Sequence, residues 1–165
     1  MLRIIRSMSE MDFEQLMVVY TETNLHSGKR LIPFGSEYDQ NLYVHQDFYR
    51  YLLDFFKDPC AFYAVWICDR QYKAALRIEQ YRDGFLLCAL ETAPPARRRG
   101  YATALIKAVL AYLAQREGMK VYAHVDKRNI ASLSIHASCG FKRILDHAVY
   151  IDGSVLQSSC TLLWN

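Results

Sequence analysis

The chain has 165 residues, of which 52% are hydrophobic and 22% charged, and its formal net charge is +3. This length and composition are typical of a globular protein, and we expect a single domain over residues 1–165 rather than a disordered or low-complexity chain. The small net charge argues against generic binding to nucleic acid or to membrane surfaces, because the basic residues outside 97–99 are interleaved with acidic ones.

The sequence shows no signal for secretion or for membrane insertion. Residues 1–13 lack the apolar stretch of a signal peptide, and the apolar run at 85–90 is too short to cross a bilayer. The five cysteines form no CxxC pair and the five histidines have no ligand spacing, which predicts reduced, mostly buried thiols and no metal site. We therefore expect a cytoplasmic protein.

The N-terminal part predicts two helices separated by a loop. Residues 9–12 (SEMD) resemble a capping box, and apolar residues then follow at helical spacing, so we expect a helix from about 10 to 23. The segment 25–44 is mixed in polarity and contains glycine and proline, which predicts a long loop that could carry binding residues. A second helix is expected at about 45–57, ending before Pro59.

From residue 61 the hydrophobic period changes to that of strands. The segments 61–69, 72–81 and 85–92 predict three antiparallel strands, with Asp83-Gly84 as a tight-hairpin signal between the last two. Pro94-Pro95 ends the third strand, because proline cannot donate to a ladder.

The C-terminal half predicts a crossover connection between parallel strands. Apolar spacing over 102–113 indicates a long amphipathic helix ended by Gly118, and 119–125 reads as a strand. Asn129 caps a short helix ended by Gly140, and two further strands flank residues 152–153. The predicted fold class is α+β with α/β/α layers: a mixed, largely antiparallel sheet of about six to seven strands flanked by helices.

The turn at 97–102 (RRRGYA) predicts an anion site. It lies between a strand end and a helix start, where unpaired backbone N–H groups and the helix dipole attract negative charge. Gly100 allows an anion to approach the backbone closely, and the preceding arginines supply charged donors. A pyrophosphate is the natural ligand of such a turn.

Two motifs resemble those of the GNAT superfamily of acyl-CoA-dependent N-acyltransferases. The family's pyrophosphate loop reads Arg/Gln-x-x-Gly-x-Gly/Ala, which residues 97–102 match, with Pro94 upstream as is common in the family. Residues 129–141 (NIASLSIHASCGF) are similar to its second signature, Asn-x-x-Ser/Ala-x-x-x-Tyr-x-x-x-Gly-Phe. The resemblance covers about 60–141, while residues 1–58 match only in their two-helix layout. It implies an N-acetyltransferase that uses acetyl-CoA as co-substrate and a primary amine as acceptor.

The resemblance also implies where the co-substrate binds. The third strand would hydrogen-bond the pantetheine arm through its backbone, and the turn would hold the pyrophosphate. The implied binding residues are Thr92, Arg97, Arg98, Arg99, Gly100, Tyr101, Ala102, Thr103 and Asn129.

Three residues are candidates for the acid and base chemistry. His136 stands where many family members have a tyrosine that protonates the departing thiolate, and an imidazole with a pKa of about 6.5 could do the same. The alternative is a packing role beside Ser132. Glu91 is the first candidate for the general base and Glu79 the second, while a structural role for either glutamate and a water relay are the alternatives.

The sequence also gives expectations for the acceptor. Glu22, Glu37 and Asp39 lie in the segment 20–44, which we expect to border the acceptor channel, and they should attract a cationic amine. The aromatic residues of 43–56 are suited to wall a compact pocket. We therefore expect a small amine rather than a folded protein. A non-catalytic acyl-CoA-binding domain is the alternative, and a nucleic-acid module is disfavoured because the basic cluster is one turn long. Monomer and homodimer both stay open.

Overall fold

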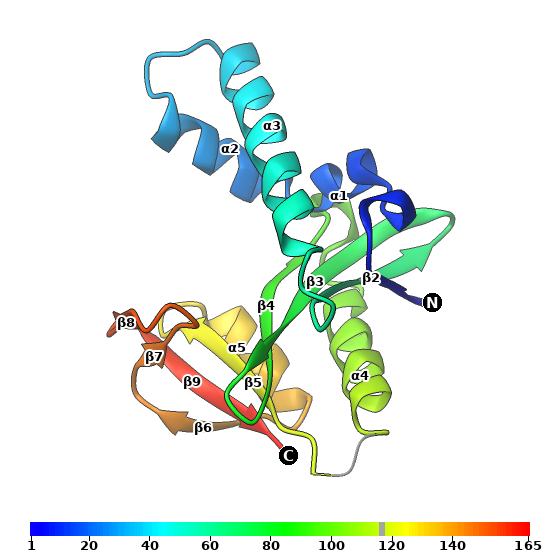
Figure 1. Cartoon of the computed structure of the whole chain (residues 1–165), viewed down its shortest axis with the longest axis vertical. Helices are drawn as coiled ribbons and strands as arrows, with labels where there is room; N and C mark the ends of the chain where they lie inside the picture. Colours follow the sequence, from blue (N-terminus) through cyan, green and yellow to red (C-terminus); the bar gives the residue numbers. More distant parts are fainter. Residues whose placement is uncertain (116–117) are drawn as a thin grey trace.

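The computed structural model describes residues 1–115 and 118–165. In chain order its strands and α-helices are β1 (Leu2–Ile5), α1 (Phe13–Val19), α2 (Thr21–Leu31), α3 (Glu37–Phe55), β2 (Phe62–Cys68), β3 (Gln71–Tyr81), β4 (Gly84–Thr92), α4 (Tyr101–Leu113), β5 (Val121–Asp126), α5 (Ile130–Ser138), β6 (Lys142–Leu145), β7 (Ala148–Val149), β8 (Val155–Leu156) and β9 (Ser159–Trp164) (Figure 1). Two 3-10 turns, Met8–Glu10 and Pro94–Ala96, precede α1 and α4.

A seven-stranded mixed sheet in the order β1-β2-β3-β4-β5-β9-β6 organises the chain. Its neighbouring strands are antiparallel except β4 and β5, which are parallel and joined through α4. The strands β7 and β8 form a separate hairpin around residues 152–153. This architecture confirms the predicted fold class and the predicted crossover.

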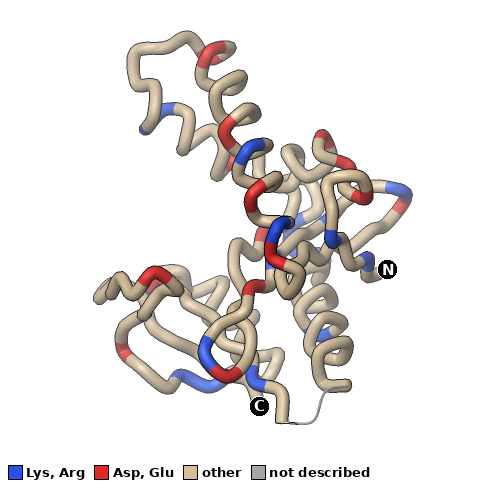
Figure 2. Tube along the Cα trace, in the orientation of Figure 1, with Lys and Arg blue, Asp and Glu red and all other residues tan. Residues whose placement is uncertain are grey.

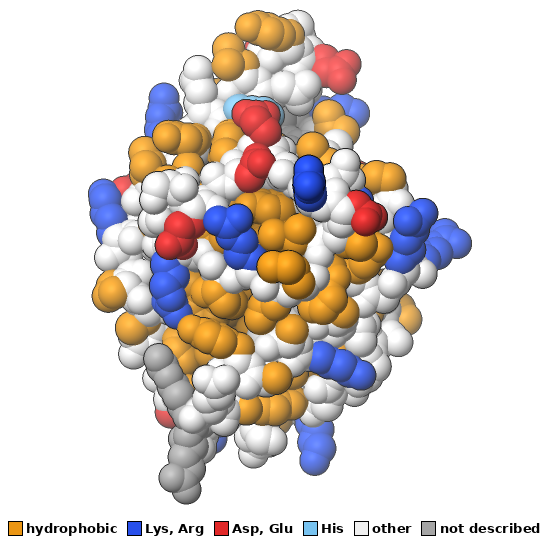
Figure 3. All heavy atoms as spheres, turned by 90° about the vertical axis from the view of Figure 1, so that its right-hand side faces the viewer, with side chains coloured by type: hydrophobic (Ala, Val, Ile, Leu, Met, Phe, Trp, Pro, Cys, Tyr) orange, Lys and Arg blue, Asp and Glu red, His pale blue; other side chains and the backbone are white. Residues whose placement is uncertain are grey.

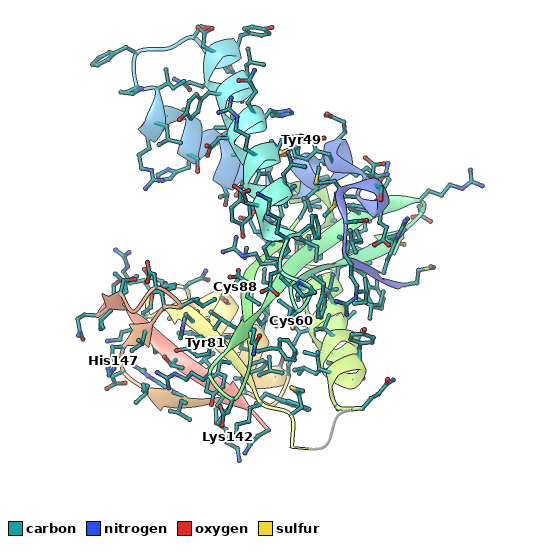
Figure 4. The ribbon with its side chains drawn as sticks, in the orientation of Figure 1. Tyr49, Cys60, Tyr81, Cys88, Lys142 and His147 are labelled. Atoms are coloured by element: carbon teal, nitrogen blue, oxygen red, sulfur yellow. The ribbon has the colours of Figure 1, made fainter. Side chains whose placement is uncertain are left out.

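The parallel pair opens soon after it begins. Its ladder joins residues 85–87 of β4 to residues 121–123 of β5, and beyond it the two strands diverge (Figure 1). Farther along β4, Ala75 pairs with Glu91 and Arg77 with Cys88, so that β4 has one residue more than β3 in this stretch. This is a β-bulge, and within it Ala89 has a φ of 50°. Cys88, labelled in Figure 4, lies on β4 at the opening.

The sheet carries one hydrophobic core on each face. On one face α4 packs its predicted apolar side against the strands, and the buried contacts include Leu76, Ile78, Leu105, Ile106, Val109 and Leu110. On the other face α1 and the C-terminal part of α3 cover the strands, and the core there includes Leu16, Val19, Leu52, Phe55, Tyr63 and Val65. The periodicity of the sequence therefore predicted the buried side of α4 correctly.

The N-terminal helices differ from the prediction. The segment 25–44 is not a loop, because α2 occupies its first part and α3 begins at Glu37. Ser36 and Asp39 form a capping box at the start of α3, a signal that the glycine and proline beside it obscured. The expected box at 9–12 is absent. Instead Asp12 caps α1 by accepting a hydrogen bond from the Gln15 N–H at 3.1 Å.

The secondary structure differs from the prediction at three further places. The strand β1 was not predicted, since its four residues are too few to show a period. The helix α4 ends at Leu113, before Gly118, and residues 116–117 between them lie outside the described residues. The C-terminal tail contains four strands rather than two, because β6 and β9 join the main sheet beside the β7–β8 hairpin.

The helices α2 and α3 form an arm that projects from the sheet (Figure 1). Figure 2 shows acidic and basic residues both spread over the trace, consistent with the small net charge. Hydrophobic side chains are visible at the far end of the arm in Figure 3, where Phe34 and Tyr38 are exposed. No helix in the described ranges is long and apolar enough to span a membrane. The five thiols are free, with Cys139 and Cys160 buried and Cys60 exposed.

Gly84 provides a test of the junction between β4 and β5. A Cβ atom at this position would lie 2.1 Å from the Lys120 carbonyl oxygen, which accepts a hydrogen bond from the Phe85 N–H at 3.0 Å. We expect Gly84→Ala to lower the free energy of unfolding by about 1–3 kcal/mol, because the backbone must move to relieve the overlap.

The control is Gly28→Ala in α2, where the new Cβ would meet the Gln40 side chain at 3.0 Å. There the helix propensity of alanine, about 1 kcal/mol better than glycine, should offset the contact. Denaturant unfolding of both variants measures the difference. A Gly84→Ala protein as stable as the wild type would contradict the described junction.

Candidate functional site

A cavity of about 810 Å³ lies between the end of β4, the start of α4 and the start of α5, and we call it the loop cavity. Most of the predicted binding residues line it: Thr92, Arg97, Arg98, Gly100, Tyr101, Ala102, Thr103 and Asn129. The exception is Arg99, which lines a different cavity together with residues 71–73 of β3. The structure thus brings together eight of the nine residues from two separate motifs.

The loop before α4 has the backbone geometry of an anion site. Gly100 is the N-cap of α4 with a φ of 79°, and Arg98 also has a positive φ, of 60°. The N–H groups of residues 101–103 in the first helical turn have no intrahelical partner. No atom lies within 4 Å of a Cβ built on Gly100, so that the backbone is open on that side. This arrangement fits a pyrophosphate, as the sequence predicted.

Arg97 is held by the arm rather than left free. Its Nη1 and Nη2 atoms each donate to one carboxylate oxygen of Glu22 at 2.8 Å, and its Nε donates to the Thr92 carbonyl oxygen at 3.3 Å. The hydrogen bonds that Arg97 donates to Glu22 raise the pKa of Arg97. Glu22 was expected to attract the acceptor, but its charge is instead committed to this pair. Arg98 is exposed and makes no ion pair within the described ranges.

Asn129 and α5 form the opposite wall of the loop cavity. The Asn129 side chain accepts a hydrogen bond from the Ser132 N–H at 3.0 Å, which confirms its predicted role as the N-cap of α5. Ala131, Ser132 and Ile135 complete this wall. The second motif therefore shapes the cavity by fixing the start of α5.

A second cavity, of about 350 Å³, lies between the arm and strands β2 to β4, and we call it the arm cavity. Tyr20, Phe48, Tyr51 and Tyr63 supply aromatic walls, in agreement with the compact pocket expected beside 43–56. The acidic residues that line it are Asp47 and Glu91. Glu37 and Asp39 do not line it, because both lie in the first turn of α3, where Asp39 completes the capping box.

Glu91 lies where the two cavities meet. It lines both, as does Thr23, whose hydroxyl donates a hydrogen bond to Oε1 of Glu91. Burial raises the pKa of Glu91, while the bond from Thr23 and the charge of Arg97 lower it in part. A partly buried carboxylate with a raised pKa at the junction of two cavities is well suited to accept a proton.

Glu79 lies elsewhere and is paired. Its Oε1 accepts a hydrogen bond from Arg77 Nε at 2.5 Å, and the two side chains are 21% and 28% exposed. It lines a third cavity, of about 400 Å³, with His124 and residues 150–152, and neither of the first two. The geometry therefore favours the structural alternative for Glu79 and leaves Glu91 as the better-placed base.

His136 does not line any of these three cavities, which weakens its expected role as a general acid. Its side chain is 2% exposed, its Nδ1–H donates to the Ser132 carbonyl oxygen at 2.8 Å, and its ring packs edge-on against Phe141. Nε2 is buried and has no hydrogen-bond partner in the described part of the chain. Burial lowers the pKa of His136, so that the imidazole is neutral near neutral pH and holds its proton on Nδ1. The geometry favours the packing alternative.

Two functional residues, Thr23 and Arg77, and one contact of Tyr20 escaped the sequence analysis. Tyr20 donates a hydrogen bond from its hydroxyl to the Ala89 carbonyl oxygen at 2.6 Å and thereby fixes the bulge. Thr23 was predicted to be the last residue of a helix over 10–23, whereas it lies in the first turn of α2. Arg77 alternates with apolar residues along β3 and looks like an ordinary outward-facing strand residue. The positive φ of Ala89 in the bulge also has no signal in the sequence.

Comparison with known proteins agrees with this geometry. The model of the acetyltransferase (GNAT) family matches residues 24–141. A search of proteins with curated functions gave no match.

Similar solved structures include three acetyltransferases. PaiA N-acetyltransferase from Thermoplasma acidophilum in complex with coenzyme A is 14% identical, with 99% of this chain and 98% of that chain covered and a TM-score of 0.65. Ribosomal-protein-alanine N-acetyltransferase from Brucella melitensis is 18% identical, with 99% and 98% covered and a TM-score of 0.67. Aminoglycoside 6'-acetyltransferase type Ii is 12% identical, with 100% and 96% covered and a TM-score of 0.64. At these identities the likeness shows the shared fold.

The burial of neutral His136 predicts a pH dependence of stability. The folded-state pKa of His136 lies below its unfolded value, so its neutral form contributes stability that is complete above about pH 6.5 and is lost as the pH falls. His136→Gln removes this titration. We expect the free energy of unfolding of the wild type to fall more steeply between pH 7 and pH 5 than that of the variant, with one proton worth up to about 1.4 kcal/mol per pH unit.

Denaturant unfolding at several pH values measures both slopes. His124 also has a pKa lowered by burial, so His124→Gln is a matched control that shows how much of the common slope a second histidine supplies. Parallel curves for the wild type and His136→Gln would mean that His136 is not buried in its neutral form.

Proposed function

The chain belongs to the acetyltransferase (GNAT) family, and we propose that it transfers an acetyl group from acetyl-CoA to the primary amine of a small molecule. One observation carries this proposal: the loop cavity, which is built to hold a pyrophosphate, meets the aromatic arm cavity at Glu91. A donor in one cavity and an acceptor in the other would place the reacting groups beside a carboxylate with a raised pKa.

In this proposal each residue has a separate role in binding or catalysis. Arg98, Gly100 and the first N–H groups of α4 bind the pyrophosphate of acetyl-CoA, and the end of β4 near Thr92 lies along the pantetheine arm. Glu91 takes a proton from the acceptor ammonium, directly or through water. The neutral amine then attacks the thioester carbonyl carbon, the C–N bond forms as the C–S bond breaks, and coenzyme A leaves as a thiolate. The acylated nitrogen then loses a second proton and the thiolate takes one up, so that the reaction releases overall the one proton that Glu91 first accepted.

The size of the arm cavity supports a small acceptor. A volume of about 350 Å³ is at the lower end of the range for small-molecule sites, and four aromatic rings enclose it. The names of the similar structures do not decide the acceptor, because one is named for a ribosomal protein and another for aminoglycosides. We also treat residues 1–165 as one domain, since β1 and β9 both pair within the central sheet.

A non-catalytic acyl-CoA-binding domain would need the loop cavity alone. The continuation of that cavity into a second one, with Glu91 at the junction, favours catalysis over simple binding.

Gly100 tests the binding of acetyl-CoA. A side chain here would project from a left-handed backbone into the loop cavity, so we expect Gly100→Val to weaken acetyl-CoA binding at least tenfold. The matched control is Gly153→Val, because Gly153 has a similar φ of 82°, also faces open space and lies on the β7–β8 hairpin. Both variants should lose similar stability, of about 1 kcal/mol or more, from backbone strain.

Isothermal titration calorimetry with acetyl-CoA measures the affinity of each variant. We expect Gly153→Val to bind like the wild type. Affinity of Gly100→Val within about threefold of the wild type would show that the loop does not hold the pyrophosphate.

Glu91 tests the chemical step. We expect Glu91→Gln to keep its affinity for acetyl-CoA and to lower kcat by about 10²- to 10⁴-fold, which is the usual worth of general base catalysis. The rate of the wild type should rise with pH, because Glu91 acts in its deprotonated form. Thr23→Val removes a hydrogen bond that lowers the pKa of Glu91, so the acid limb of kcat should move to higher pH.

Thr21→Val is the matched control for Thr23→Val, since the Thr21 hydroxyl donates to the Val18 carbonyl oxygen at 2.8 Å and does not contact Glu91. Its pH profile should coincide with that of the wild type. Steady-state rates measured across the pH range with one acceptor decide the matter, and an unshifted limb in Thr23→Val would remove Glu91 from the base role.

A further inference from the structure

We propose that the acceptor carries a carboxylate beside its amine, as an amino acid does, and that Arg77 and Tyr63 bind this carboxylate. The inference rests on the proposed function and names the chemical class of its acceptor. The starting observation is a guanidinium group that lines the acceptor side of the site. Such a group would repel an acceptor that carries only an ammonium group.

Arg77 occupies a central place in the acceptor region. It lies on β3 two residues from Ala75, which pairs with Glu91, and its own partner on β4 is Cys88 beside the bulge. Arg77 and Ala89 line both the arm cavity and the third cavity. Residues two apart on a strand share a face and lie about 7 Å apart. Because Ala75 is the partner of Glu91, the distance from Arg77 to the position of Glu91 is similar to the length of a small molecule.

The guanidinium group lies close to the side chains of Tyr51, Tyr63 and Cys88, none of which is a carboxylate. Glu79 accepts a hydrogen bond from Nε, and Tyr51 lies against the group with its ring centre 5.1 Å from Cζ. Neither Nη1 nor Nη2 donates to a carboxylate within the described part of the chain. An arginine fixed at Nε and at one face presents its remaining edge to a ligand, and a carboxylate is the group that this edge binds with two hydrogen bonds.

Tyr63 gives an independent sign of a missing ligand. It is 0% exposed and lines the arm cavity, yet its hydroxyl has no hydrogen-bond partner among the residues that the structure describes. A buried hydroxyl without a partner costs free energy that a bound acceptor would recover. A carboxylate on Arg77 would supply the acceptor oxygen that the Tyr63 hydroxyl lacks.

The charges of the arm cavity complement a zwitterion. Two carboxylates, Asp47 and Glu91, and two guanidinium groups, Arg30 and Arg77, line it. Burial lowers the pKa of Arg77, but Tyr51, Tyr63 and Glu79 around it raise that pKa above its ordinary value overall, so the group stays cationic. A diamine would have to place a second positive charge near this fixed cation, whereas an amino acid offers its ammonium to Glu91 and its carboxylate to Arg77.

The experiment compares acceptors that differ only in the carboxylate. Phenylalanine with phenethylamine and lysine with cadaverine are two such pairs. Calorimetry measures the affinity of each for the protein saturated with coenzyme A, and the acetyl-transfer assay gives kcat/KM for each. We expect the carboxylate-bearing member of at least one pair to bind at least tenfold more tightly and to have the higher kcat/KM.

The variants test which side chains supply this preference. Arg77→Met combined with Glu79→Gln removes both charges of the partly buried pair and should reduce the preference to less than about twofold. Tyr63→Phe should also reduce it without loss of stability, because its hydroxyl has no partner to leave behind. The matched control is Arg82→Met, since Arg82 lies over the Tyr81 ring at the same 5.1 Å but lines none of the described cavities. It should keep the wild-type preference.

The outcomes separate this inference from the proposed function. Failure of the wild type to bind acetyl-CoA by calorimetry would overturn the proposed function itself. If acetyl-CoA binds, then equal affinity within both pairs, tighter binding of the carboxylate-free amines, no detectable binding by any member, or an unchanged preference in the double variant and in Tyr63→Phe would each overturn the carboxylate site.

Discussion

The opening between β4 and β5 is the constraint on which the candidate site depends. A parallel ladder that continued along the whole of β4 would close the sheet and leave no room for either substrate. The ladder stops after Leu87 because the bulge at Ala89 turns β4 away from β5. A non-glycine residue with positive φ costs about 1 kcal/mol or more. Tyr20, at the end of α1, donates a hydrogen bond from its hydroxyl to the Ala89 carbonyl oxygen and helps to offset this cost.

The extent to which the sequence predicted the fold follows from how local each determinant is. The strands β2 to β4, the helix α4 and the cap at Asn129 depend on periodicity and on capping within a few residues, and all of them were predicted. The helix expected at 45–57 corresponds to the C-terminal part of α3, but the segment 25–44 was wrongly predicted as a loop because of its glycine and proline residues, among them Gly28 and Gly35. Gly28 is instead buried inside α2 against Gln40, a contact between two helices that local patterns do not encode. Tertiary contacts here override intrinsic propensity.

The residues of the candidate site also differ in how far the local sequence could predict them. The anion loop was predictable because Gly100 and the helix start lie side by side in sequence. Arg77, Thr23 and Tyr20 gain their importance from distant neighbours: Thr23 from Glu91 and Tyr20 from Ala89. The expectation for His136 came from its place in a motif, whereas its burial and its Nδ1–H bond to the Ser132 carbonyl depend on how α5 packs. Motif position thus located the helix correctly but did not determine the environment of this side chain.

Glu79 and Glu91 show how environment assigns different tasks to the same residue type on adjacent strands. Glu79 is paired with Arg77, whose Nε donates to Oε1 at 2.5 Å, and it lies away from the loop cavity and the arm cavity. Glu91 has no arginine in direct contact, because Arg97 is occupied by Glu22. Burial can therefore raise the pKa of Glu91. The Glu22–Arg97 pair is itself exposed and contributes little to stability. Its larger effect is on the site, since it keeps a strong cation from pairing with the carboxylate that must accept the proton.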